Sequence, residues 1–135
     1  MLSAQKRHVK AEKHFVLEQT TRQAEELFIE GNKEYILGHF QKAADLLQRA
    51  LKIQPKNSAI YLKLTQCYGE LKMLDKAFEM CQKAVEFEPE NTYYTYFLAQ
   101  MHEGRREYKE ALKIYEKTIK TSKGTEKLLY DIVKL

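Results

Sequence analysis

The sequence is poor in the residues that interrupt helices. It has five glycines and two prolines in 135 residues. An all-β sandwich needs many more turn residues than this, so the composition favours long helices. Long apolar runs are missing too, and none approaches the roughly 20 residues of a membrane-spanning helix. We therefore expect an all-α chain without a membrane span.

Cysteine is almost as scarce. Cys67 and Cys81 are the only two, and they lack the short spacing of a metal site or the number that a disulfide scaffold needs. This predicts a reducing, intracellular compartment, and we take the cytoplasm as the default. The N-terminus has no apolar core of signal-peptide type. It is basic, but Glu12 and the preference for Lys over Arg argue against mitochondrial targeting.

Charge and hydrophobicity are in the range of a folded, soluble protein. Charged residues make up 31% of the chain, hydrophobic residues 44%, and the formal net charge is +4. Disorder is therefore not expected to be the main state. The length allows one domain or one short stack of repeats.

The sequence repeats itself with a period of 34 residues. Residues 24–57 overlay 58–91 with identities at Leu37/Leu71, Lys42/Lys76, Ala43/Ala77, Gln48/Gln82, Ala50/Ala84, Pro55/Pro89 and Asn57/Asn91. Residues 92–125 continue the register, in which Ala77 meets Ala111. Three units therefore cover 24–125, and such a period indicates stacked supersecondary units.

Each unit reads as two helices. In the second unit we predict them at about 58–71 and 75–87, with Asn57 capping the first and Asp75 the second. Gly38 and Gly104 stand near the turn between the helices in the first and third units, where a left-handed residue would end the first helix. The recurring alanines allow two helix backbones to approach closely.

This pattern resembles the tetratricopeptide-repeat (TPR) family, most closely in the segment EGNKEYILGHFQKAADLLQRALKIQPKN. The resemblance covers 24–125. It implies a right-handed α-solenoid of helix–turn–helix repeats, with about seven to eight helices in this chain. The repeats would be 24–57, 58–91 and 92–125. Residues 1–23 would form a basic N-terminal helix, packed on or continuous with the first repeat, or a tail. Residues 126–135 would form a capping helix or a truncated fourth repeat, and their end in mid-pattern slightly favours an excised piece of a longer array.

Some residues depart from the family pattern. Glu30 and Glu34 occupy positions that are usually apolar, and we expect them to be solvated at the terminal repeat or to face the basic N-terminal segment. In the third repeat, Thr95 replaces an aromatic residue and Thr118 replaces the usual alanine. Lys123 replaces the usual proline, so the end of the last helix is uncertain by a few residues.

Residues with catalytic or metal-binding patterns are missing. The glycines are scattered, so no phosphate-binding loop forms. The histidines are His8, His14, His39 and His102, and none makes an i, i+4 pair with another. His102 is predicted to pack as a core residue, and Cys81 as a small hydrophobe. We therefore predict that the chain is not an enzyme and binds no metal and no cofactor.

The remaining candidate for function is a surface. In TPR proteins the first helix of each repeat lines the concave face, at repeat positions 2, 5, 6, 9, 12 and 13. This implies a binding groove made of Phe28, Ile29, Asn32, Tyr35, Leu62, Lys63, Gln66, Tyr93, Tyr96, Phe97 and Gln100. Several are apolar or aromatic, and contiguous exposed apolar surface usually marks a binding site.

One TPR subclass grips the acidic C-terminus of the Hsp70 and Hsp90 chaperones with a carboxylate clamp. At the five clamp positions this chain has Phe28, Asn32, Lys63, Tyr93 and Phe97, of which only Asn32 matches. A terminal carboxylate would lose its charge-assisted hydrogen bonds there. The sequence therefore argues against this subclass.

Three interpretations of function follow. The first is an interaction module that takes a partner helix or an extended peptide in the aromatic groove. The second is a structural segment of a larger TPR scaffold or homo-oligomer, with the groove filled by its own chain. An enzyme or a nucleic-acid binder is least favoured, although the third repeat and the N-terminal segment each carry a net charge of +3.

Overall fold

The computed structural model describes residues 2–121 and residue 133, and within them it contains six α-helices. They are α1 Leu2–Ile36, α2 Phe40–Ile53, α3 Ser58–Glu70, α4 Leu74–Phe87, α5 Thr92–Gly104 and α6 Tyr108–Thr121. Two of them fall within one residue of the helices predicted for the second repeat. The all-α class is therefore confirmed for this part of the chain.

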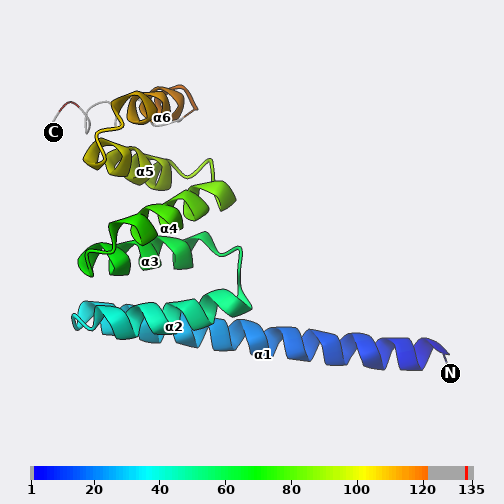
Figure 1. Ribbon diagram of the computed structural model, residues 1–135. Helices are drawn as coiled ribbons and strands as arrows, with labels where there is room; N and C mark the ends of the chain where they lie inside the picture. Colours follow the sequence, from blue (N-terminus) through cyan, green and yellow to red (C-terminus); the bar gives the residue numbers. More distant parts are fainter. Residues whose placement is uncertain (1, 122–132, 134–135) are drawn as a thin grey trace.

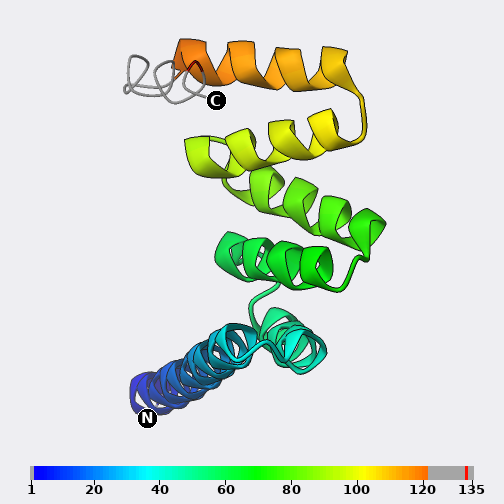
Figure 2. The ribbon, with the colours of Figure 1, turned by 90° about the vertical axis from the view of Figure 1, so that its left-hand side faces the viewer.

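The helices form three antiparallel pairs that stack in chain order (Figure 1). The pairs are α1–α2, α3–α4 and α5–α6, and α2 packs on α3 as α4 packs on α5. The side view shows the same succession from the first pair to α6 (Figure 2). Within residues 2–121, the main helix contacts lie inside a pair or between successive pairs, as expected for a repeat stack.

The expected number of about seven to eight helices was wrong for the described residues, which form six. No turn separates the basic N-terminal segment from the first helix of the repeat, so both form one helix of 35 residues. Among the alternatives for the N-terminal segment, its described residues 2–23 are helical and continuous with the first repeat. The capping helix or fourth repeat predicted for 126–135 lies outside the described residues, apart from Val133.

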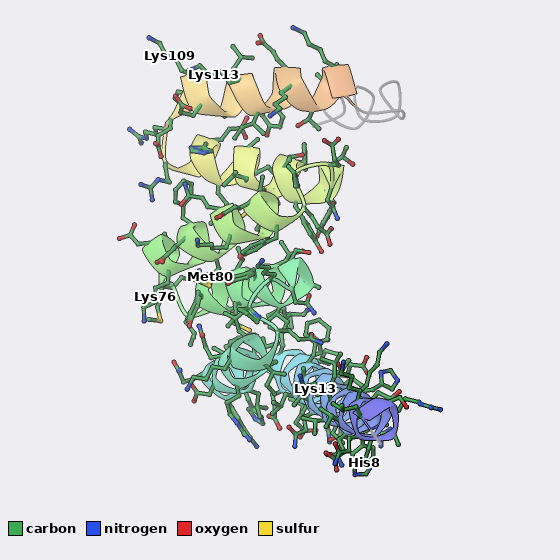
Figure 3. All side chains as sticks on the ribbon, turned by 90° about the vertical axis from the view of Figure 1, so that its right-hand side faces the viewer. His8, Lys13, Lys76, Met80, Lys109 and Lys113 are labelled. Atoms are coloured by element: carbon green, nitrogen blue, oxygen red, sulfur yellow. The ribbon has the colours of Figure 1, made fainter. Side chains whose placement is uncertain are left out.

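The N-terminal half of α1 extends beyond the stack (Figure 1). All its side chains from Leu2 to Gln19 are exposed, and Figure 3 shows His8 and Lys13 on this projecting part. Ion pairs one turn apart support the helix there, with His8 3.1 Å from Glu12. None of the helices in residues 2–121 combines the length and hydropathy that crossing a bilayer requires.

A left-handed residue ends the first helix of every pair. These residues are Gly38, Lys72 and Arg106, with φ of 82°, 62° and 62°. In each case the next residue donates its N–H to a carbonyl five residues earlier, for example His39 to Glu34 at 2.9 Å. The prediction for Gly38 is confirmed. In the third repeat the left-handed residue is Arg106, two residues after Gly104.

The helix starts differ in how they are capped. The side chain of Asn57 accepts a hydrogen bond from the N–H of Ala59, as predicted, and Asn91 accepts one from Tyr94. Asp75 was wrongly predicted as a cap. It lies in the first turn of α4, after Met73 at the cap position, where its charge favours the helix N-terminus.

Alanines form the contacts within and between the pairs. Ala43, Ala77 and Ala111 occupy one repeat position and are at most 2% exposed, and Ala50 and Ala84 are fully buried at another. Leu47, Ile60 and Leu64 are the large side chains with no exposure. Small residues thus recur in the core of each pair, where they set the distance between helix axes.

Polar and aromatic contacts add links between successive pairs. Gln48 of α2 donates a hydrogen bond to the hydroxyl of Tyr68 in α3 at 2.9 Å. Between the second and third pairs, the Arg105 guanidinium lies 4.2 Å from the centre of the Phe78 ring and 3.4 Å from Asp75. Such contacts fix the rotation of one pair against the next.

Glu34 is buried within its own helix pair. Its carboxylate lies 2.7 Å from His39 Nδ1 and 3.2 Å from Lys42 Nζ. Neither alternative drawn from the sequence is correct for Glu34, which is 5% exposed and does not face the N-terminal segment. The hydrogen bond with His39 lowers the pKa of Glu34, burial opposes this, and Lys42 adds to the lowering.

We expect Gly31→Ala to destabilise the protein. A Cβ there would lie 2.9 Å from Cγ of the fully buried Leu47. The overpacking costs about 1–3 kcal/mol and exceeds the gain of about 1 kcal/mol in helix propensity. Gly69→Ala is the matched control, since its Cβ would meet nothing within 4 Å. Urea unfolding should show a loss of about 1 kcal/mol for Gly31→Ala and a gain of up to about 1 kcal/mol for Gly69→Ala. Equal effects at both sites would contradict the close approach.

We expect Glu34→Gln to reduce stability near neutral pH and to matter progressively less in acid. A carboxyl whose pKa is lowered on folding stabilises the native state above its ordinary pKa of 4.5. That contribution is lost as the pH falls through the lower folded pKa. The difference in Tm between wild type and variant should therefore be largest above about pH 4.5 and shrink below it. A constant difference from pH 7 to pH 3 would show that the charge of Glu34 plays no part.

Candidate functional site

The eleven predicted groove residues lie on α1, α3 and α5, the first helices of the three pairs. The helix period brings repeat positions 5, 9 and 12 to one side of each helix. The three helices follow one another along the stack (Figure 2). We call the eleven residues on them the row, and their side chains differ in direction.

Two groove residues from different helices meet at the first and second pairs. Lys63 Nζ of α3 lies 4.3 Å from the centre of the Tyr35 ring of α1, which is a cation–π contact. Tyr35 also packs against the core, as does Phe28. Burial is the main cause that raises the pKa of Tyr35, so its hydroxyl remains protonated at neutral pH. The rings of Tyr35 and Phe28 therefore belong both to the packing of the fold and to the row.

Asn32 has an unused acceptor. Its Oδ1 atom is shielded from solvent and has no hydrogen-bond partner within residues 2–121. A buried acceptor without a partner costs free energy comparable to a lost hydrogen bond. Asn32 is one turn from both Phe28 and Tyr35, so this acceptor lies beneath the first part of the row rather than on its surface.

On α5 the aromatic residues divide between the row and the core. Tyr93 and Phe97 form a tilted pair with ring centres 6.4 Å apart. Tyr96 lies 5.7 Å from the ring of Tyr115 in α6, so it is turned toward the partner helix of its own pair. Burial raises the pKa of Tyr115 to about 12, in keeping with a ring held inside the pair.

Exposure separates the members of the row further. Ile29 is 66% exposed and Tyr93 56%, and Gln100 is exposed as well. Leu62, Lys63 and Gln66 of α3 are half-buried. Ile36, which is 81% exposed next to Tyr35, was not among the eleven residues. Exposed apolar side chains thus stand at both ends of the row, with a more buried and more polar middle.

The two thiols are buried. Burial raises the pKa of Cys67 to about 11 and that of Cys81 to about 12, so thiolate is scarce at neutral pH. His102 packs edge-on against the Phe78 ring at 5.0 Å, which confirms its prediction as a packed residue. Within the described residues, no three His, Cys, Asp or Glu side chains gather so that they could hold a metal ion.

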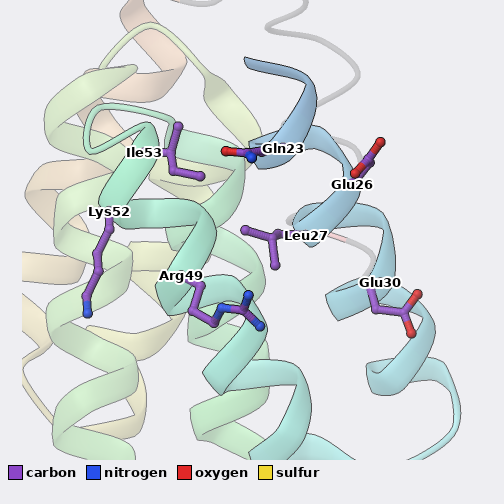
Figure 4. A pocket seen from close by; sticks show the side chains of 7 residues that line it. All are labelled: Gln23, Glu26, Leu27, Glu30, Arg49, Lys52 and Ile53. Atoms are coloured by element: carbon purple, nitrogen blue, oxygen red, sulfur yellow. The ribbon is translucent and has the colours of Figure 1, made fainter. Parts of the chain in front are cut away.

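An open hollow of about 720 Å³ lies between α1 and α2, outside the predicted groove (Figure 4). Glu26 and Glu30 of α1 stand on one side, Arg49 and Lys52 of α2 on the other, and Leu27 lies between the two helices. Glu30 is exposed here, which confirms that it is solvated at the first repeat. The only sequence signal for this hollow was the charged Glu30 at a repeat position that is usually apolar.

Comparison with known proteins supports the fold. The family profile described as tetratricopeptide repeat matches residues 35–101. The crystal structure of MamA is 27% identical, with a TM-score of 0.71, over 79% of this chain and 63% of MamA. The chain thus spans less than two thirds of that relative. The comparison with curated proteins gave no match.

Two further solved structures cover most of both chains. The Sgt2 TPR domain from Aspergillus fumigatus is 26% identical, with a TM-score of 0.64, over 82% of this chain and 80% of that domain. The first TPR of Spaghetti (RPAP3), bound to the HSP90 peptide SRMEEVD, is 21% identical, with a TM-score of 0.70, over 84% and 93%. Residues 35–101 are therefore assigned to the tetratricopeptide-repeat family, and the solved structures show that the described helix pairs share its fold.

Proposed function

We propose that this chain is a protein-interaction module that binds a partner helix or an extended peptide along the row of α1, α3 and α5. The observation that carries the proposal is the exposure of Ile29 and Tyr93 on these helices. Apolar side chains that the fold does not use are typical of binding surfaces. The repeat bounds 24–57, 58–91 and 92–125, and a cytoplasmic location, belong to the same proposal.

The row supplies different kinds of contact along its length. Ile29 and Tyr93 are the apolar anchors at its two ends, and aromatic anchors contribute strongly to interface energy. Asn32, one turn from both Phe28 and Tyr35, adds a half-buried polar side chain to the first part of the row. Lys63, held over the Tyr35 ring, carries a positive charge in the half-buried middle. A ligand with two apolar anchors and an acidic or polar centre fits this order best.

The alternative is a structural segment of a larger scaffold or of a homo-oligomer, with the row covered by the same kind of chain. One observation bears on it. Residues 2–19, the exposed part of the basic N-terminal segment, continue α1 in a straight line away from the stack (Figure 1). They therefore leave the row of their own molecule open. Leu2, Val9 and Val16 of this segment are exposed, and a second molecule that covers them would form the contact that this alternative needs.

We expect the double variant Ile29→Asp/Tyr93→Asp to lose its partner in affinity capture from a native extract, read by mass spectrometry. Both side chains are more than half exposed, so two carboxylates there should leave the fold intact, which circular dichroism will check. The matched control is Leu112→Asp on α6, where Leu112 is 57% exposed but lies off the row. The control should retain the partner.

Equal capture by wild type and double variant would contradict the proposal and would move the site elsewhere on the surface. A homo-oligomer that dissociates only in the double variant would support the alternative. Tyr96 and Phe28 are poorer targets, because their rings also hold α6 and the core.

We expect the peptide SRMEEVD not to bind, in contrast to the first TPR of Spaghetti. Phe28, Tyr93 and Phe97 stand where the clamp needs groups that bind a carboxylate, so the terminal carboxylate would lose most charge-assisted hydrogen bonds. Fluorescence anisotropy with the labelled peptide should give a Kd weaker than about 1 mM. Micromolar binding that Asn32→Ala abolishes would place the chain in the clamp subclass after all.

A further inference from the structure

The second and third repeats differ at one internal site. In the second, Tyr61 is buried, its ring stacks on that of Phe87 with centres 5.6 Å apart, and its hydroxyl donates to the carbonyl oxygen of Pro55 at 2.8 Å. The 34-residue register places Thr95 and Thr121 at the positions of the two rings, and Pro89 at the position of Pro55. The third repeat thus keeps the proline and lacks both aromatic rings.

The space that Tyr61 fills in the second repeat is open in the third. A pocket of about 140 Å³ lies between α4, α5 and α6, and its walls include Pro89, Thr95, Leu98, Ile114 and Thr118. Three of these correspond in the repeat register to Pro55, Tyr61 and Leu64. The pocket therefore lies where the repeat register places the counterpart of the Tyr61 ring, and it is not a chance gap in packing.

Hydrogen bonds hold Thr95, which stands in the place of Tyr61, and Thr118, which stands in the place of the smaller Ala84. The Thr95 hydroxyl lies 3.1 Å from the carbonyl oxygen of Thr92 and 3.2 Å from the Thr118 hydroxyl. The Thr118 hydroxyl lies 2.7 Å from the carbonyl oxygen of Ile114. Because these hydroxyls bond to their own helices and to each other, the remaining wall is mainly apolar, from Val85, Leu98 and Ile114.

We propose that this pocket binds a phenol ring, namely the side chain of a tyrosine supplied by a partner polypeptide. Tyr61 is the template for the occupant, because it fills the equivalent space in the same fold with a ring and a donated hydrogen bond. The pocket volume is close to the roughly 150 Å³ of an apolar cavity that holds one benzene molecule. Pro89, whose carbonyl is the counterpart of the Tyr61 acceptor, is among the lining residues.

The chemistry of tyrosine suits both parts of the pocket. The ring gains from leaving water for a wall of Val85, Leu98 and Ile114, and the hydroxyl finds an acceptor at the proline end. Glu90 and Lys117 also line the pocket and are exposed, so residues 2–121 leave it open to the surface. None of the eleven groove residues lines it. The part of the proposal that takes the ring from a partner polypeptide rests on the proposed interaction function. The binding of a phenol ring in the pocket does not.

The test is titration of the ¹⁵N-labelled full chain with p-cresol, the tyrosine side chain as a free molecule, followed by NMR. We expect saturable, millimolar shifts of the amides of Thr92, Thr95, Leu98 and Ile114. 4-Methylanisole, which keeps the ring and removes the donor, should bind at least about threefold more weakly if the hydroxyl bonds to an acceptor. Absence of saturable shifts at these amides, or equal binding of the two compounds, would overturn the assignment.

Two variants make the test specific to the pocket. Thr95→Tyr restores the ring of the second repeat, so it should abolish p-cresol binding and raise Tm by about 4 °C through filled space. Thr95→Val keeps the size of the side chain and should retain binding within about threefold. A folded Thr95→Tyr variant that still binds p-cresol would show that the ring goes elsewhere. A fall in Tm would show that the space does not match Tyr61.

The source of the ring is tested with N-acetyl-tyrosinamide, which carries the side chain on a peptide backbone. Shifts of the same amides support a polypeptide partner, whereas binding of p-cresol alone would overturn that part of the proposal. Ile29→Asp, on the row, should leave the p-cresol titration unchanged. Failure of the pocket and failure of the row are therefore distinguished, since each has its own variant and its own readout.

Discussion

Close contact between helices at alanine and glycine positions is the constraint on which the rest of this structure depends. Ala43, Ala77 and Ala111 are buried at one repeat position, and Gly31 leaves no room for a Cβ against Leu47. Because the helix axes are held at this short distance, one side of each first helix packs on its partner helix, and the second helix of each pair packs on the first helix of the next. The same contact leaves the other side of α1, α3 and α5 uncovered, and that side is the row proposed for binding.

The residues of the row serve two different purposes in the repeat stack. Phe28 and Tyr35 pack partly against the core, and Tyr96 packs against Tyr115, so their rings stabilise the stack. Ile29 and Tyr93 are more than half exposed and contribute little to it. Stability and recognition are thus divided between neighbouring residues of one helix, and this division allows the exposed residues to change without loss of the fold.

The sequence predicts the architecture because the signals that define it are local and recur. The 34-residue period, the alanines and the Asn57 cap all specify helix pairs before any long-range contact is known. The errors arise where the outcome depends on competition or on partners far along the chain. No residue between Leu2 and Ile36 breaks the helix, so the N-terminal segment adds no separate helix to the count, and the buried Glu34 is paired with His39 and Lys42.

The direction of side chains was equally hard to read from spacing. Position 5 carries Tyr96 on α5, and Tyr115 opposite it decides that its ring turns inward. Lys72 and Arg106 adopt left-handed conformations although they are not glycines, because the turn length is fixed by the stack. A single sequence indicates which positions belong to the row, but the neighbouring helix decides which of them remain available.

Internal repetition also supplies its own control. Because three copies of one unit share a backbone, a difference between copies can be assigned to the side chains that differ. The change from Tyr61 and Phe87 to Thr95 and Thr121 is such a case, and read along the chain it was only a departure from the family pattern. In three dimensions the same change coincides with a pocket where the second repeat has a buried ring. The wall of that pocket keeps Leu98 and Pro89 in the places of Leu64 and Pro55, so the space retains the character of the ring that is missing. Comparison of repeats within one chain therefore identifies what a space can hold, which comparison of sequence alone does not.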